Sequence, residues 1–222
     1  MKKEPLLIVG SSGHAKVIID IVEKEGRYDI VGLLDAFKEK GSKVCDYEIL
    51  GKEEDLPELM KKFSNVHVII AIGDNHTRQL VYDKLLSVVP AVSFGNAIHP
   101  SAVIGRDVTW GKGIVVMAGA TINSGSEIGD FTIINTQASL DHDGKMGAFS
   151  SLAPGVICGG NVSIGNFSAI SIGATVKHGI TIGEHSVIGA GSVVLKDCDK
   201  ESVYYGAPAR FIRKRAVGEK YL

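Results

Sequence analysis

The sequence predicts two domains of different class: a Rossmann-like α/β domain over residues 1–97, followed by an all-β parallel β-helix over residues 98–222. Two observations predict this division. Residues 6–89 alternate between strand and helix patterns, which is typical of a small parallel α/β sheet. Between Ile98 and Val194, apolar residues recur at every sixth position without interruption. Neither an amphipathic helix nor an isolated strand produces that period.

The composition is that of an ordinary globular protein. The chain has 222 residues, 45% of them hydrophobic, and a formal net charge of −1. That balance favours neither nucleic acid nor a membrane surface as a partner. No apolar run approaches the roughly 20 residues of a membrane span, and the run after Pro5 is too short for a signal peptide. The 3 cysteines are far apart, so we expect a reduced, cytoplasmic protein.

The first domain is predicted from its local patterns. We expect strands over residues 6–10, 28–35 and 67–73, and helices over residues 14–26, 53–63 and 75–89. One face of the first helix carries Ala15, Ile18, Ile19 and Val22, and one face of the third carries Leu80, Val81, Leu85 and Val88. The boundary to the second domain falls near residues 93–100, where glycine, asparagine and proline break the helical pattern.

A glycine loop joins the first strand to the first helix. In VGSSGHAK, residues 9–16, Gly10 and Gly13 allow a tight turn and the close approach of a ligand. Free N–H groups at the helix start suit a phosphate. The loop has G-x-x-G and not the full G-x-G-x-x-G, which favours a mononucleotide or nucleotide sugar over a dinucleotide. Asp35 ends the second strand, where a carboxylate often meets a ribose or base. The alternative is an unliganded turn in which Asp35 only caps a loop.

The second domain is predicted from its six-residue period. Its apolar anchors are Ile98, Ile104, Trp110, Val116, Ile122, Ile128, Ile134, Leu140, Met146, Leu152, Cys158, Ile164, Ile170, Val176, Ile182, Ile188 and Val194. Glycine often follows an anchor, and a small or β-branched residue lies four positions after it. Each hexad therefore reads as a short strand and a bend, and three hexads make an 18-residue coil. Coils stacked about 4.8 Å apart bury one apolar column, and the repeat holds a little over five coils.

One charged segment interrupts the repeat. SLDHDGKMG, residues 139–147, places His142 between Asp141 and Asp143. A histidine titrates near working pH and can serve as a general base, and a carboxylate on its other ring nitrogen would fix the tautomer. Neighbouring residues on a strand point to opposite faces. Asp143 can therefore orient His142 only at a bend, and Asp141 is a rival. By spacing alone, a solvated polar corner is an equal alternative.

Several motifs together resemble one family. VGSSGHAK, IGDN, IHPSAVIG, IINTQASLDHD, LAPGVICGGNVSIG, IGAGSVVLKD and YGAPAR are similar to those of bacterial sugar acyltransferases related to sialic acid O-acetyltransferase and UDP-N-acetylbacillosamine N-acetyltransferase. The resemblance covers nearly the whole chain. It implies a left-handed β-helix, a homotrimer, a nucleotide sugar on the first domain, and acetyl-CoA in the groove between neighbouring helices.

The resemblance also implies roles for individual residues. His142 matches the family's catalytic base and Asp143 its orienting acid. The positions that match substrate contacts are Gly10, Ser11, Ser12, Gly13, His14, Asp35, Gly51, Gly73 and Asn135. The positions that match acetyl-CoA contacts are Ser151, Gly160, Ile172, Ala190 and Gly191, with Gly160 as a backbone donor to the thioester carbonyl. One departure is Ser151, which stands where the family commonly has a second histidine; a hydroxyl cannot act as a base at neutral pH.

These observations favour an enzyme that transfers an acetyl group from acetyl-CoA to the amino group of a nucleotide-activated, UDP-linked sugar through a ternary complex. One alternative is O-acetylation of sialic acid or a related sugar. Another is a non-catalytic sugar-nucleotide sensor or assembly protein. An acyl-enzyme is disfavoured because Cys158 is an anchor and should be buried. We expect no metal, since the coils offer no close pair of histidines.

Overall fold

The computed structural model describes residues 3–221, and the chain divides into two compact units. The first comprises Met1–Gly73 and Thr77–Pro100, and the second Asp74–His76 and Ser101–Leu222. The predicted boundary, after residue 97, lies close to this division. The short segment Asp74–His76 groups with the second unit, where the Asn75 amide donates a 3.2 Å hydrogen bond to the Ser168 carbonyl.

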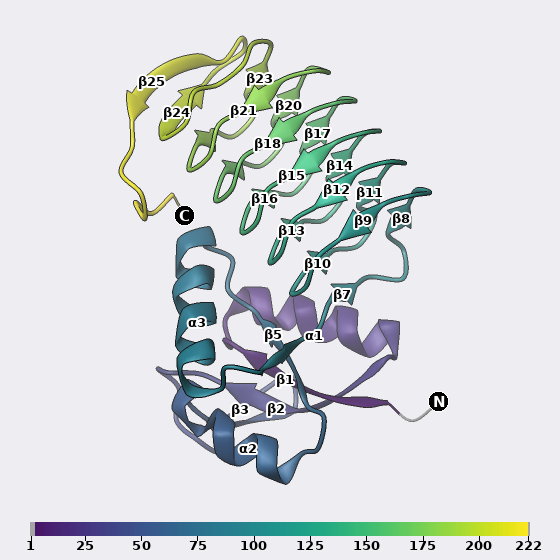
Figure 1. The fold of residues 1–222 in the computed structure, drawn as a ribbon, viewed down its shortest axis with the longest axis vertical. Coiled ribbons are helices and arrows are strands. Elements are labelled where there is room, and N and C mark those ends of the chain that lie inside the picture. The colour runs from purple at the N-terminus through teal and green to yellow at the C-terminus, as the bar shows by residue number, and fades with distance from the viewer. Residues whose placement is uncertain (1–2, 222) are drawn as a thin grey trace. The chain divides into compact units, whose positions relative to one another are not determined.

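The first unit is a six-stranded sheet with three α-helices (Figure 1). Its elements are β1 (Glu4–Val9), α1 (Gly13–Glu25), β2 (Tyr28–Leu34), β3 (Lys43–Val44), β4 (Tyr47–Gly51), the 3-10 turn η1 (Glu53–Asp55), α2 (Leu56–Lys62), β5 (His67–Ile70), α3 (Asn75–Val88) and β6 (Ser93–Phe94). The strand order is β3-β4-β2-β1-β5-β6. All pairs are parallel except β3 with β4. The carboxyl ends of β1, β2 and β5 therefore share one edge, where a Rossmann-like sheet binds its ligand.

The predicted helices and strands of this unit are present. The prediction of which face of α3 is buried was wrong in part. The α1 face predicted to be buried is buried, and Ile21 joins it. On α3, Leu85 is fully buried, but the side chain of Leu80 is 54% exposed. Arg78 is buried instead, because its guanidinium donates to the carbonyls of Ile72 and Gly73 at 2.9 Å each. A hydrophobicity pattern cannot identify a buried arginine of this kind.

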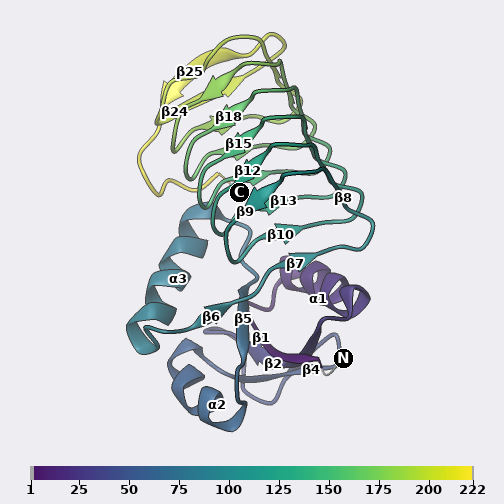
Figure 2. The ribbon, with the colours of Figure 1, turned by 45° about the vertical axis from the view of Figure 1, so that its right-hand side comes forward.

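The second unit is a parallel β-helix built from two-residue strands. These are β7 (Ala97–Ile98), β8 (Val103–Ile104), β9 (Thr109–Trp110), β10 (Val115–Val116), β11 (Thr121–Ile122), β12 (Glu127–Ile128), β13 (Ile133–Ile134), β14 (Ser139–Leu140), β15 (Lys145–Met146), β16 (Ser151–Leu152), β17 (Ile157–Cys158), β18 (Ser163–Ile164), β19 (Ala169–Ile170), β20 (Thr175–Val176), β21 (Thr181–Ile182), β22 (Val187–Ile188) and β23 (Val193–Val194). The strands stack from coil to coil into three sheets, which are the three faces of a prism (Figures 1 and 2). An antiparallel hairpin, β24 (Ser202–Tyr205) and β25 (Arg210–Lys214), ends one sheet.

Three turns separate the strands of each coil, so the stack has three corners. The His142 corner holds the turns at 124–125, 142–143, 160–161 and 178–179. The Ile172 corner holds those at 136–137, 154–155, 172–173 and 190–191, and the phenylalanine corner those at 130–131, 148–149, 166–167 and 184–185. Strand pairing runs in strict register, such as Ser139 with Ile157 and Ile157 with Thr175. Residues 18 apart therefore lie in one column.

The predicted apolar column fills the interior. Ile122, Leu140, Leu152 and Ile188 are among the anchors with no exposed area. The anchors at the start of the stack are less buried: Ile98 and Ile104 are partly exposed, and Trp110 has 39% of its surface exposed. Its strand β9 is the first of its sheet and pairs only with β12, so its ring has a stacked neighbour on one side only.

An aromatic stack supports the phenylalanine corner. The rings of Phe131, Phe149, Phe167 and His185 stack with centroid distances of 4.9, 5.3 and 4.6 Å. Each of these residues has a positive φ, between 54° and 60°, which bulky residues seldom adopt. Ring stacking between coils offsets part of that backbone strain.

Within residues 3–221, no helix combines the length and apolar character needed to cross a bilayer.

The buried column predicts a clear difference between two leucines. Leu152→Ala should lower the free energy of unfolding by about 2–5 kcal/mol, because it opens a cavity in the column. Leu195 is 48% exposed, so Leu195→Ala should change it by roughly 0.5 kcal/mol or less. Urea unfolding at one fixed protein concentration measures both, since association would otherwise shift the midpoints. Equal losses in the two variants would contradict this account of the core.

Candidate functional site

The charged interruption lies at a bend. His142 and Asp143 are the two residues of one turn between β14 and β15, and Asp143 has φ 56°. This left-handed conformation turns the Asp143 side chain back toward its neighbour. The Nδ1 atom of His142 and the Oδ2 atom of Asp143 are 2.8 Å apart. The condition for Asp143 to orient the imidazole is therefore met in the structure.

Asp141 makes a different contact. Its Oδ1 atom accepts a hydrogen bond from the backbone N–H of His142 at 2.8 Å and another from the Asn123 amide at 2.7 Å. Asp141 thus holds the backbone of the turn, whereas Asp143 holds the ring. With Nδ1–H donating to Asp143, Nε2 is left as the acceptor that a general base needs.

The two carboxylates shape the electrostatics of the turn. The hydrogen bond that the His142 ring donates to Asp143 raises the pKa of His142 above its ordinary value, and the negative charges of Asp141 and Asp143 act in the same direction. The hydrogen bond from Asn123, followed by that from the His142 N–H, lowers the pKa of Asp141. Asp141 is therefore ionised at neutral pH, and His142 is a stronger base than a free histidine.

Gly160 lies directly against the imidazole. A Cβ atom at this position would be 2.5 Å from His142 Nε2 and 2.6 Å from its Cε1. Any side chain at residue 160 would displace the ring. Gly160 is the next residue in the His142 column, and His178 is the one after it, so the two histidines are two coils apart. The predicted separation of His178 from the reacting nitrogen is consistent with this stacking.

The coil before His142 supplies two residues that the sequence analysis missed. Besides Asn123, the hydroxyl of Ser126 donates to the Asp141 carbonyl at 3.2 Å and accepts from the Gly144 N–H at 3.3 Å. Both residues lie 18 positions before the residues of the turn that they align with. A comparison of residues at that spacing, rather than at six, could have found them.

The glycine loop of the first unit is organised around Asp35. The Ser11 hydroxyl donates to Asp35 Oδ2 at 2.5 Å, and the backbone N–H groups of Phe37 and Lys38 donate to Oδ1 at 2.8 and 3.1 Å. Lys38 Nζ donates to the Ser11 carbonyl at 2.9 Å. Burial raises the pKa of Asp35, but these hydrogen bonds outweigh it and the pKa is lowered. Asp35 therefore joins two loops at the carboxyl edge of the sheet.

The start of α1 is open to solvent at Ser12 and Gly13. The Ser12 hydroxyl does not cap the helix, so it does not compete with an anion for the first-turn N–H groups. His14 behaves differently: burial, together with the nearby Arg78 guanidinium, lowers its pKa to about 4. Its Nε2 atom is buried without a hydrogen-bond partner among the described residues. His14 is neutral at working pH.

The other glycines predicted to contact substrate have local structural reasons. Gly10 has φ 102°, and a Cβ atom there would be 2.9 Å from the Ala71 carbonyl oxygen. At Gly51, a Cβ atom would overlap the carboxylate of Asp55. The Gly73 carbonyl accepts the hydrogen bond from Arg78. Substrate contacts at these positions stay predictions.

The predicted cofactor residues lie on different parts of the prism. Ile172, Ala190 and Gly191 are exposed on the Ile172 corner, where the Gly191 N–H donates to the Ile172 carbonyl at 2.9 Å. Asn135 adjoins the same corner, and its side-chain oxygen accepts from the Thr136 N–H at 2.8 Å. Gly160 belongs to the His142 corner, and Ser151 begins β16 on another face. Within one chain, the face that carries β14, β17 and β20 separates the two corners.

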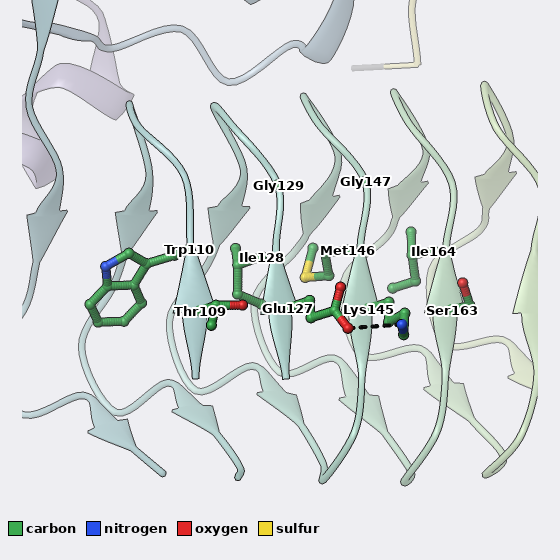
Figure 3. Close-up of a pocket in the computed structure, with 10 residues that line it drawn as sticks. All are labelled: Thr109, Trp110, Glu127, Ile128, Gly129, Lys145, Met146, Gly147, Ser163 and Ile164. Carbon is green, nitrogen blue, oxygen red and sulfur yellow. Dashed lines mark ion pairs between the residues drawn. The ribbon is translucent and has the colours of Figure 1, made fainter. Parts of the chain in front are cut away.

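A groove of about 420 Å³ runs along β9, β12, β15 and β18. Figure 3 shows the Trp110 side chain extending from the first of these strands, β9, and the ion pair between Glu127 and Lys145, whose charged atoms are 2.8 Å apart. None of the predicted site residues lines this groove. In this unit, His142, Asp143, Gly160, Ile172, Ala190 and Gly191 lie instead at the corners.

Two further predictions concern cysteine and metal. Cys158 is buried as predicted, and burial raises the pKa of its thiol to about 12, which makes it a poor nucleophile. Among residues 3–221, no group of three histidine, cysteine, aspartate or glutamate side chains is placed to hold a metal ion.

Family models match both units. Residues 5–85 match the PglD N-terminal domain, and residues 161–196 match the bacterial transferase hexapeptide, six repeats. Among curated proteins, the chain is 34% identical to UDP-N-acetylbacillosamine N-acetyltransferase of Bacillus subtilis over 50% of each chain. It is 31% identical to GDP-perosamine N-acetyltransferase of Escherichia coli O157:H7 over 54% of this chain and 52% of the relative. These alignments thus span about half the length of each curated relative.

Solved structures extend the similarity to 95% of this chain. A histidine-to-asparagine mutant of perosamine N-acetyltransferase from Caulobacter crescentus, in complex with CoA and GDP-perosamine, is 37% identical with a TM-score of 0.89, over 95% of this chain and 97% of that one. The acetyltransferase domain of PglB from Neisseria gonorrhoeae, in complex with acetyl coenzyme A, is 28% identical with a TM-score of 0.84, over 95% of this chain and 100% of that one.

These similarities confirm the predicted fold class, a Rossmann-like domain followed by a left-handed β-helix. The two family models also cover the glycine loop and part of the hexapeptide repeat that the sequence analysis singled out. The chain therefore belongs to the family of hexapeptide-repeat sugar acetyltransferases that includes the UDP-N-acetylbacillosamine and GDP-perosamine N-acetyltransferases.

Proposed function

We propose that this protein transfers the acetyl group of acetyl-CoA to the amino group of a nucleotide-activated sugar. The observation that carries the proposal is the turn that pairs His142 with Asp143 at 2.8 Å and leaves Nε2 as an acceptor. The relatives support the reaction class, because their names describe N-acetyltransferases and one structure holds both CoA and GDP-perosamine.

The proposed reaction is a direct transfer in a ternary complex. The sugar amine, in its neutral form, attacks the carbonyl carbon of the thioester, and His142 Nε2 takes a proton from the nitrogen as the new C–N bond forms. The C–S bond then breaks, the thiolate leaves, and the imidazolium returns the proton to sulfur. Asp143 keeps the proton on Nδ1 and stabilises the imidazolium. The backbone of Gly160, on the following coil and against the ring, is the proposed donor to the developing oxyanion.

The acceptor is proposed to bind the first unit through its nucleotide. The open start of α1, with Ser11, Ser12 and Gly13, would hold the diphosphate, while Asp35 and Lys38 fix the loop around it. The resemblance predicts a UDP-linked sugar, and a solved neighbour that is 37% identical holds a GDP-linked one. The two nucleotides are therefore the first acceptors to compare.

The cofactor site is proposed to lie between copies of the chain. Gly160 and His142 occupy one corner, whereas Asn135, Ile172, Ala190 and Gly191 occupy another, so a second copy is needed to bring the two sets together. The face between them is suited to association: its outward residues are uncharged, and Val103 and Ile157 are 59% and 54% exposed on it. This supports the predicted homotrimer, which would seat acetyl-CoA at its seams.

A panel of acceptors tests the proposed function. Thiol release from acetyl-CoA should appear with a UDP- or GDP-linked amino sugar and stay at background with the matching hydroxy sugar and with free sialic acid. Release with sialic acid or the hydroxy sugar would establish O-acetylation instead. Nucleotide-sugar binding without any thiol release would favour the sensor.

His142→Ala separates catalysis from binding. The variant should lose at least 100-fold in kcat, because a positioned general base contributes on the order of 100- to 10,000-fold. Its affinity for the nucleotide sugar, measured by calorimetry, should stay within about 2-fold of the wild type if the glycine loop holds the nucleotide. If His142→Ala retained the wild-type kcat, His142 would be excluded as the base.

The raised pKa of His142 fixes the direction of the pH dependence. The base must be neutral to work, so kcat/KM should fall as the pH drops through a pKa above the ordinary value of 6.5. Asp143→Asn removes the largest cause of that increase, and its acid limb should move to lower pH while kcat falls. Comparing the two proteins with one acceptor cancels the titration of the acceptor amine. Superimposable acid limbs would show that Asp143 does not act on His142.

A further inference from the structure

We propose that Asn123 is a positioning residue for His142 and acts through Asp141. The inference rests on the proposed function, since it concerns the turn that carries the proposed base. Asn123 Nδ2 donates to Asp141 Oδ1 at 2.7 Å, and the same oxygen accepts the His142 backbone N–H at 2.8 Å. The Asp141 Oδ1 atom thus connects Asn123 on the preceding coil to the backbone of His142, the proposed base.

The preceding coil holds this turn at both ends, but with two kinds of contact. At the far end, Ser126 is fully buried, and its hydroxyl bonds only to backbone groups, the Asp141 carbonyl and the Gly144 N–H. Ser126 therefore supports the shape of the turn. At the near end, Asn123 bonds to a charged side chain, so it also decides where the negative charge of Asp141 lies.

The position of that charge bears on His142. The charged groups of the turn beside the imidazole are Asp141 and Asp143, and both negative charges raise the pKa of His142. The coil below contributes the neutral Ser124 to the column and the coil above contributes Gly160, with His178 one coil further. Without Asn123, the Asp141 carboxylate loses a partner that keeps it against the turn. It can then rotate toward water, which weakens both its hold on the His142 N–H and its charge at the ring.

Asp141 is also the acid that the sequence left as a rival orienter of the imidazole. In the structure, Asp143 pairs with the ring nitrogen of His142, and Asp141 accepts the hydrogen bond from the His142 backbone N–H. One carboxylate, that of Asp143, thus contacts the ring, and the other, that of Asp141, holds the backbone of the turn. Asn123 is then the residue that connects Asp141 to the preceding coil.

The test uses four variants of the full chain: Asn123→Ala, Asp141→Asn, the double variant, and Ser126→Ala. Asn123→Ala should lower kcat by roughly 10- to 100-fold, as loss of a positioning contact commonly does, and move the acid limb of kcat/KM to lower pH. Asp141→Asn should do the same. Because the two residues act in series, the double variant should lose no more than the larger single loss. Ser126→Ala is the matched control, which should lower the unfolding midpoint and leave the acid limb in place.

A titration of the His142 ring by NMR reads the same contact without turnover, with His142→Ala used to assign the signal. The pKa of His142 should be lower in Asn123→Ala than in the wild type. If the wild type acetylates no acceptor, the proposed function fails, and this titration still decides the role of Asn123. An unchanged titration, or additive losses in the double variant, would overturn the inference and leave Asn123 with a structural role like that of Ser126.

Discussion

The β-helix depends on the hydrogen-bond ladder between consecutive coils. The Asp143 N–H donates to the Ser124 carbonyl at 3.0 Å and the Asn161 N–H to the His142 carbonyl at 2.9 Å, and similar bonds recur around every coil. The ladder keeps residues 18 apart in one column at nearly constant spacing. A side chain in this unit therefore meets mainly its own column and the positions beside it. The composition of each column, more than local sequence, decides what each corner can do.

The columns explain how one prism carries both rigid structure and chemistry. At the phenylalanine corner, the rings fill the column and stack from coil to coil. At the His142 corner, the next residue in the column is glycine, and the imidazole occupies the space that a side chain would take. The preceding coil places its polar side chains, Asn123 and Ser126, under the turn. A base can thus be exposed to substrates and still be held on one side by a rigid frame.

Much of the fold could be predicted from the sequence because each coil buries the same positions in the same way. The period identified the β-helix, and Cys158 was correctly placed inside it. The resemblance favoured Asp143 as the partner of the imidazole, but the residues alone left Asp141 as a rival, because the choice depends on the positive φ of Asp143. Asn123 was missed for a related reason: a hexad pattern compares positions six apart, whereas the contact joins residues 18 apart.

In the first unit, the limits of prediction have other causes. The strands β3 and β6 have two residues each, too few to show an alternating pattern. The buried face of α3 includes Arg78, whose guanidinium donates to two carbonyls in the loop after β5. A hydrophobicity pattern places such a residue outside and moves Leu80 inside in its place. The glycine loop was recognisable, but the bond from Ser11 to Asp35 that shapes it joins residues on two different loops.

The placement of the candidate residues on two corners limits what a single chain can do. Each corner of a triangular prism is convex, and the face with β14, β17 and β20 lies between the corner of His142 and that of Ile172. A long, flexible cofactor needs a concave surface to bury its length, and a convex corner offers none. Two prisms packed side by side create a groove between a corner of one and a corner of the other. If the residues on both corners serve one reaction, association is part of the active site, because only a second copy can face His142 with the Ile172 corner.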